Sequence, residues 1–137
     1  MRKEIVLISK NKMLGLCLGM YLSFPEQHNN TTRINLFSNI DELNAKLDSF
    51  SISPDLIIFV CTYSSSEQIS RIKKTSVLEL STPLILLSSF NNSEMTTLIN
   101  NFSQCHFVFK TQGYTELLKE KTDSLLQFQE FKNRNSA

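Results

Sequence analysis

Two polar side chains that could bind an anion stand at the ends of apolar runs. The run Leu84–Leu87 is followed by Ser88, and the run Phe107–Phe109 is followed by Lys110. A hydroxyl and an ammonium group can both donate to an anionic oxygen. Runs this rich in Ile, Val and Leu are typical of strands in a buried parallel sheet, whose ligands bind at the carboxyl ends. We therefore expect Ser88 and Lys110 at one edge of a sheet.

Two further apolar runs close without an acidic residue. Ile5–Ile8 is followed by Ser9 and Lys10, and the run that begins at Leu56 ends at Val60. Magnesium requires oxygen ligands, usually including carboxylates, and acid–base catalysis needs titratable groups placed together. Neither is available at these four strand ends. The sequence therefore predicts no metal, no cofactor and no enzymatic activity here.

The three cysteines, Cys17, Cys61 and Cys105, are widely spaced and lie in or beside apolar segments. This usage is typical of a reduced cytosolic protein in which buried thiols act as small hydrophobic groups. Cys61 offers an alternative, because a cation such as Lys10 or Lys110 beside it would lower the thiol pKa and make it reactive. We expect the inert buried thiol. Neither histidine stands at a ligand spacing from a cysteine pair, so no zinc site is predicted.

Composition and charge describe one ordinary globular domain. The chain has 137 residues, of which 41% are hydrophobic and 20% charged. Its net charge of +1 supplies no long-range attraction to nucleic acid or anionic lipid. No run approaches the ~20 apolar residues of a membrane span. We expect a cytoplasmic protein without a membrane or direct nucleic-acid contact, with a domain over residues 1–132 and a tail or linker at 133–137.

Apolar periodicity predicts five strands that alternate with five helices. Strands are expected at 5–8, 34–37, 55–61, 84–88 and 107–110, and helices at 13–24, 40–50, 67–80, 93–102 and 115–131. Ser38 or Asn39 is the expected N-cap of the second helix. Such alternation gives an α/β fold with a five-stranded parallel sheet, helices on both faces and the flavodoxin-like order 2-1-3-4-5.

Gly15 and Gly19 stand four residues apart in the first expected helix. They could allow a neighbouring element to approach closely. Alternatively they only weaken the helix, by roughly 1 kcal/mol each relative to Ala. We expect the second effect.

The strand ends resemble those of a response-regulator receiver domain, a CheY-like fold. The resemblance rests on Pro54-Asp55-Leu56-Ile57, on Ser88-Ser89, and on the spacing of Phe107 and Lys110. Most receivers place a Pro after the lysine. This chain instead continues Thr111-Gln112-Gly113-Tyr114-Thr115-Glu116-Leu117, which is similar to receivers followed by a LuxR-type (NarL-type) helix-turn-helix.

The resemblance also marks a departure from the family. Its phosphoacceptor Asp falls on Val60, and its acidic metal-binding pair falls on Ser9 and Lys10. This implies a pseudo-receiver that cannot take the phosphoaspartate signal. Lys110 would then pair with a backbone carbonyl, with Asp55 or with water. Ser88 would bind a ligand oxygen or cap the following loop, and we expect the capping role.

Phe107 matches the aromatic residue that reorients when receivers switch. Because no phosphoryl group would act on Ser88 in a pseudo-receiver, we expect Phe107 to pack in the core.

The last expected helix has more apolar positions than one core-facing stripe needs. We expect some of them to contact a partner. The resemblance implies dimers that form either through helices one and five or through helix four, strand five and helix five, so helix five is common to both. A linker or a downstream domain could cover the same residues instead. The positions are Leu117, Leu118, Leu125, Leu126, Phe128 and Phe131.

The sequence thus favours a regulatory domain of a LuxR-type transcription regulator. It would form a homodimer, or a heterodimer with another receiver-type regulator, and so control DNA binding by a module outside these residues. One alternative is a standalone adaptor that binds another regulator. Another is an anion or cyclic-dinucleotide sensor that uses the pocket around Ser9, Lys10, Ser88 and Lys110.

Overall fold

The computed structural model describes residues 3–23, 32–49, 52–61, 72 and 81–135, with side chains up to Gln127. Its centre is a sheet of five parallel strands in the order β2-β1-β3-β4-β5, which confirms the predicted fold class. The strands are β1 (Lys3–Ile8), β2 (Thr32–Phe37), β3 (Leu56–Val60), β4 (Leu84–Ser88) and β5 (Cys105–Phe109). All residues of β3 and β4 are buried, as their continuous apolar sequences predict.

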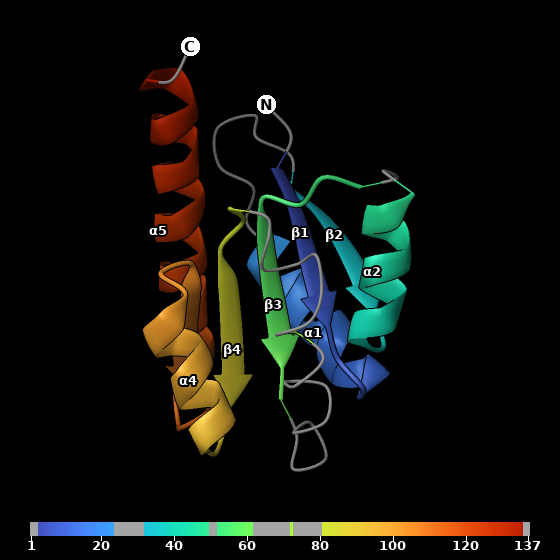
Figure 1. Cartoon of the computed structure of the whole chain (residues 1–137). Helices are drawn as coiled ribbons and strands as arrows, with labels where there is room; N and C mark the ends of the chain where they lie inside the picture. The colour runs from blue at the N-terminus through green and yellow to red at the C-terminus, as the bar shows by residue number, and fades with distance from the viewer. Residues whose placement is uncertain (1–2, 24–31, 50–51, 62–71, 73–80, 136–137) are drawn as a thin grey trace.

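Four described helices cover the two faces of the sheet (Figure 1). They are α1 (Lys12–Ser23), α2 (Ile40–Asp48), α4 (Ser93–Asn101) and α5 (Tyr114–Asn135). α1 and α5 supply Leu18, Leu22 and Leu118 to one core cluster, and α2 and α4 pack on the opposite face. The helix expected at 67–80 lies outside the described residues, apart from Ile72, which is buried in the α2 and α4 core.

Most element boundaries lie within two residues of those expected from sequence. The Asn39 side chain accepts a hydrogen bond from the Glu42 amide, so Asn39 is the N-cap of α2, as predicted. The last helix begins at Tyr114 and continues to Asn135, into the residues expected to form a tail. No helix in the described part of the chain is both long and apolar enough to cross a bilayer.

α1 approaches β2 closely at its two glycines. A Cβ atom on Gly15 would lie 2.6 Å from Leu36 Cδ1, and one on Gly19 would lie 3.2 Å from Ile34 Cγ2. Ordinary contacts between carbon atoms are 3.5–4.0 Å. The expectation that these glycines only weaken the helix was therefore wrong, because their missing side chains make room for β2.

The prediction of three buried thiols was wrong for one of them. Cys61 and Cys105 are buried, but Cys17 is exposed on α1. α1 carries apolar residues on its outer face as well as its inner face, so apolar neighbours in the sequence did not identify the buried side.

Candidate functional site

The structure brings the sequence-predicted site positions to the carboxyl edge of the sheet. Ser9 and Lys10 follow β1, Val60 and Ser88 end β3 and β4, and Lys110 follows β5. Backbone hydrogen bonds hold these ends level: the Ser9 amide donates to Phe37 O (2.9 Å) and the Lys110 amide to Ser88 O (2.7 Å). The parallel register therefore places the five positions along one edge, as the sequence predicts.

Val60 occupies the end of the central strand β3. It is only 5% exposed and belongs to the core cluster formed with α1 and α5. An isopropyl group has neither a nucleophilic oxygen nor a lone pair for a metal ion. This position therefore supports neither phosphoryl transfer to a side chain nor magnesium binding.

Ser9 forms a side-chain hydrogen bond at the start of α1. Its side chain is buried, and its Oγ donates to the Asn11 carbonyl at 2.7 Å. Asn11 in turn accepts from the Leu14 amide through its side chain, at 3.1 Å. Lys10 is exposed to solvent. Ser9 thus supports the helix cap, and Lys10 is the cation that stands where the resemblance places an acid.

Ser88 caps the loop after β4. Its Oγ donates to Phe90 O at 2.7 Å and accepts from Phe90 N at 3.1 Å. The side chain is fully buried. Of the two roles weighed for Ser88, the structure shows the capping one, because the hydroxyl proton is already used within the chain.

Lys110 lies over an aromatic ring. Its Nζ is 5.8 Å from the centre of the Tyr114 ring, within the range of a cation–π contact. Asp55, one of the three partners considered for Lys110, does not pair with it. Asp55 precedes β3 and so lies at the opposite edge of the sheet, where its Oδ2 accepts from the Glu4 amide at 2.8 Å.

The acidic residue Glu42, which lies close after β2, is engaged in helix capping. Its Oε2 accepts from the Ser38 amide at 3.1 Å, while Asn39 Oδ1 accepts from the Glu42 amide at 3.0 Å. The two bonds resemble a capping box, except that Glu42 accepts from Ser38, the residue before the N-cap, and not from Asn39 itself. Within the described residues, no three His, Cys, Asp or Glu side chains group as a metal site would require.

Cys61 is not a reactive thiolate. Burial raises its pKa to about 12, and its thiol lies 3.8 Å from Phe59 O as a weak donor. The cause of this shift is burial, and neither Lys10 nor Lys110 lowers the pKa of the Cys61 thiol. The inert buried thiol expected from sequence is therefore the form that the structure shows.

Phe107 packs as expected. Its ring is half-buried against the core cluster on the α2 and α4 face, 5.6 Å from the ring of Phe109. The role of Leu118 was predicted wrongly. Leu118 is fully buried in the core between α5 and the sheet and cannot contact a partner, because its helix turns that position inward.

The rest of the predicted α5 surface is smaller than expected. Leu117 is 52% exposed, whereas Leu125 and Leu126 are half-buried against the core. The side chains of Phe128 and Phe131 lie outside the described residues. Among the described positions of the expected contact surface on α5, Leu117 is therefore the most exposed, and Leu125 and Leu126 remain partly exposed.

Sequence reasoning missed the apolar outer face of α1. Met13, Leu16, Met20 and Tyr21 account for four of the six large apolar side chains that are exposed in the described part of the chain. The signal was present in the sequence, because no charged residue occurs between Lys12 and Ser23. A helix that is apolar on all sides is unusual on a protein surface.

Comparison with solved structures identifies the fold. The chain is similar to a two-component response regulator from Clostridium difficile, with a TM-score of 0.68 and 20% identity over 91% of this chain and 96% of that one. This is a receiver fold. Scans against protein-family models and curated proteins find no match.

Two further receiver-type structures extend the comparison. The receiver domain of an HD domain-containing protein from Pseudomonas fluorescens has a TM-score of 0.68 and 20% identity, covering 97% of this chain and 93% of that one. A LuxR-family response regulator from an Aurantimonas species has a TM-score of 0.61 and 12% identity, covering 91% and 86%. The TM-scores show a shared fold, and at identities this low the similarity shows the fold alone.

Proposed function

We propose that this chain is a receiver-like regulatory domain that does not take the phosphoaspartate signal and acts through contacts with other proteins. The observation that carries the proposal is Val60, a buried aliphatic side chain at the end of the central strand. The residues at the adjoining strand ends support it. The hydroxyl groups of Ser9 and Ser88 donate hydrogen bonds to backbone carbonyls of the chain. The Lys110 ammonium lies over the Tyr114 ring.

The proposed setting is a LuxR-type transcription regulator. The LuxR-family neighbour supports it, together with the sequence after Lys110, where the proline of most receivers is absent. In this role the domain dimerises, with itself or with another receiver-type regulator, and so sets the pairing of DNA-binding modules elsewhere. It has no catalytic role.

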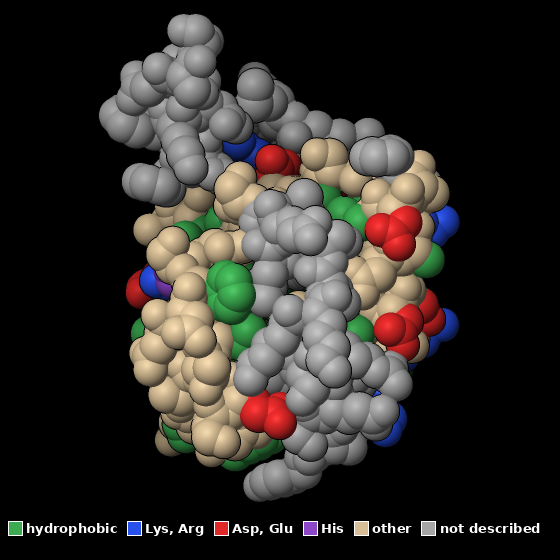
Figure 2. Space-filling view, in the orientation of Figure 1, with side chains coloured by type: hydrophobic (Ala, Val, Ile, Leu, Met, Phe, Trp, Pro, Cys, Tyr) green, Lys and Arg blue, Asp and Glu red, His purple; other side chains and the backbone are tan. Residues whose placement is uncertain are grey.

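This domain itself does not contact DNA. The net charge is +1. On the face seen in Figure 2, the described acidic and basic side chains are interspersed, with no broad basic area. Affinity for the phosphate backbone depends on clustered Lys and Arg side chains.

Intact-mass spectrometry after incubation with acetyl phosphate and magnesium tests the proposal. A receiver domain that carries the phosphoacceptor Asp, treated in parallel, reports that the donor is active. We expect this chain to keep its mass while the control gains one phosphoryl group. An acyl phosphate on this chain would refute the proposal.

Sedimentation separates the regulatory mechanism from phosphorylation. The association constant should be the same with and without acetyl phosphate, because no side chain at the site changes its charge. A donor-dependent change would contradict the proposal even if the adduct were too short-lived for mass spectrometry.

Co-purification from native cells then distinguishes a transcription regulator from an adaptor. A chain with a recognition helix supports the regulator, and a short chain bound to another regulator supports the adaptor.

A further inference from the structure

The strand β2 forms one edge of the sheet, and some of its backbone groups face away from the sheet. The Phe37 carbonyl accepts from the Ser9 amide, so Phe37 turns its backbone groups toward β1. Successive residues of a strand turn their backbone groups to opposite sides. Leu36 and Ile34, one and three residues before Phe37, therefore direct their N–H and C=O groups outward. No described residue forms a hydrogen bond with these four groups.

The edge strand β2 lacks two features that commonly protect an edge from pairing. Its residues pair with β1 in an unbroken register without a bulge, and none of them is Pro. The only charged side chain of β2 is Arg33. This side chain is exposed and has no ion-pair partner in the described part of the chain. The outer edge of β2 is therefore able to pair with a further strand.

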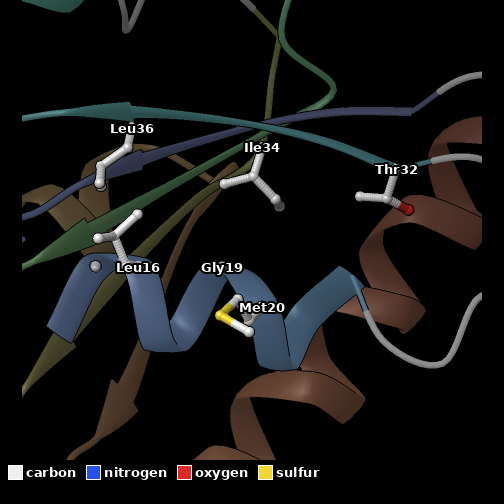
Figure 3. A pocket seen from close by; sticks show the side chains of 7 residues that line it. Leu16, Gly19, Met20, Thr32, Ile34 and Leu36 are labelled. Carbon is white, nitrogen blue, oxygen red and sulfur yellow. The ribbon is translucent and has the colours of Figure 1, made fainter. Parts of the chain in front are cut away.

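An apolar groove lies beside β2 on the face of the sheet that α1 covers. It has a volume of about 320 Å³ and is lined only by residues of α1 and β2. Figure 3 shows Ile34 and Leu36 pointing from the strand toward the helix, which contributes Leu16 and Met20. A volume at the lower end of ligand pockets suits a few side chains. The remaining lining residues are Gly15, Gly19 and Thr32.

We infer that this domain binds an extended peptide segment of another protein, which adds to β2 as an antiparallel strand. Neighbouring strands lie about 4.8 Å apart, so alternate side chains of the segment enter the groove. The residues opposite Leu36 and Ile34 each exchange two N–H···O bonds with them and share their face. These two residues are apolar, because the Thr32 hydroxyl is the only side-chain polar group of the groove lining.

Arg33 determines a third position of the segment. Phe37 packs in the core on the α2 and α4 face, and Arg33, four residues earlier in the strand, lies on that same face, away from the groove. The residue opposite Arg33 follows the second apolar residue of an antiparallel segment. An acidic side chain there meets the exposed guanidinium. Asn35 already donates to Glu4, so the residue opposite Asn35 is not specified. The pattern is apolar, any residue, apolar, acidic.

The inference rests on the proposed function, which is contact with other proteins, and deepens it by naming the chemistry of one partner. One added strand forms an interface smaller than those of stable complexes, so the complex is transient, with a dissociation constant in the micromolar range. The measurements below use neither acetyl phosphate nor dimerisation. Their failure would remove the peptide site and leave the proposed function to its own tests.

A synthetic peptide with this pattern tests strand addition on the natural chain. The probe is Ser-Thr-Val-Thr-Ile-Glu-Thr-Lys, acetylated and amidated, and calorimetry measures its binding. N-methylation of the isoleucine amide removes a donor that faces β2 and should raise the dissociation constant about tenfold. N-methylation of the threonine between valine and isoleucine, whose amide faces away, is the matched control and should change it less than about twofold. Equal effects of the two methyl groups would overturn strand addition.

Two variants of α1 test the groove. Met20→Glu puts a carboxylate at the rim of the groove, where it would face the apolar side chains of the probe, and should raise the dissociation constant about tenfold. Met13→Glu is the matched control, because Met13 is 70% exposed and Met20 is 73% exposed, but only Met20 lines the groove. Circular dichroism confirms that both variants are folded. Equal weakening by both variants would overturn the groove as the binding site.

A charge exchange tests the register. The natural chain should bind the probe about threefold more tightly than a probe with lysine in place of glutamate, since an exposed ion pair contributes little. Arg33→Glu should reverse this preference. An unchanged preference would overturn the position of the acidic residue opposite Arg33.

Sedimentation with and without the probe identifies any other occupant of the edge. A dimer that Met20→Glu abolishes and that the probe does not dissociate would mean that a second copy occupies β2, which would overturn the peptide site. The absence of calorimetric binding at millimolar probe would also overturn it. A saturable complex of one probe per chain, with the differences expected for the methylated probes and the variants, would support it.

Discussion

Replacing Gly15 by Ala should destabilise the protein, although Ala is the better helix former. A Cβ at this position would lie 2.6 Å from Leu36 Cδ1 and 3.2 Å from Ser9 Cβ. Both distances are shorter than the 3.5–4.0 Å of ordinary carbon contacts. Leu36 is half-buried and can rotate, but the Cβ of Ser9 is fixed to the backbone of a buried residue.

The magnitude follows from two opposing effects. Helix propensity favours Ala over Gly by about 1 kcal/mol in a helix interior. Overpacking a well-packed site costs about 1–3 kcal/mol. We expect Gly15→Ala to lower the free energy of unfolding by about 1 kcal/mol, which lowers the melting temperature by about 3 °C in a domain of this size.

A double-mutant cycle with Leu36→Ala isolates the close contact. Removing the Leu36 methyl groups should make Gly15→Ala neutral or stabilising in that background, with a coupling energy of about 1–2 kcal/mol by urea denaturation. Gly19→Ala is the matched control, because its nearest contact is 3.2 Å and a shift of a few tenths of an ångström relieves it. A Gly15→Ala variant that gains about 1 kcal/mol, with coupling below about 0.5 kcal/mol, would refute the close approach of α1 to β2.

Three further predictions concern the strand ends and a helix cap. Ser88→Ala removes the hydroxyl that bonds both backbone groups of Phe90 and should cost about 1–2 kcal/mol in urea denaturation; an unchanged midpoint would contradict the capping role. Burial raises the Cys61 pKa from 9.0 to about 12, so the unfolded chain loses this proton first as the pH rises. The stability that this thiol contributes should be constant below about pH 8 and lower by about 1 kcal/mol at pH 10. Cys61→Ala should lose that part of the alkaline decline, and a decline identical to that of the natural chain would be evidence against it. Asn39→Ala should cost about 1 kcal/mol by removing the side-chain bond to the Glu42 amide, and calorimetry that finds no change would exclude the cap.

The sheet was predictable because its signal is local. The runs that became β3 and β4 are apolar at every position, and such runs occur where both faces of a strand are covered. Alternation with helices then restricts the order of parallel strands to a few possibilities. The polar residues that end these runs were placed correctly at the carboxyl edge for the same reason.

The surface of the helices was not predictable in the same way. On α5, Leu117 and Leu118 are adjacent and chemically identical, yet one is half exposed and the other fully buried. The sequence identifies both as apolar, and only the rotation of the helix on the sheet separates them. On α1 the apolar residues surround the helix, so the pattern has no polar side from which the rotation could be deduced.

Partners of polar side chains at the site also depended on distances that spacing does not give. Ser88 follows an apolar run whether it binds a ligand or caps a loop, and only the position of Phe90 decides between them. Lys110 and Asp55 each lie beside a strand, but at opposite edges of the sheet. The direction of parallel strands separates them, because a residue before one strand and a residue after another lie at opposite edges of the sheet.

Ser9 links the missing carboxylates to the position of α1. Its small buried side chain lies next to the site of a Gly15 Cβ, and its hydroxyl donates to the carbonyl of Asn11 at the start of the helix. A carboxylate at position 9 would need more space and would place a negative charge against that carbonyl, which accepts and cannot donate. The serine that stands where the resemblance places a metal-binding acid is therefore the same residue that supports the start of α1. Under the proposed function, the absence of that acid and the start of α1 share one local arrangement.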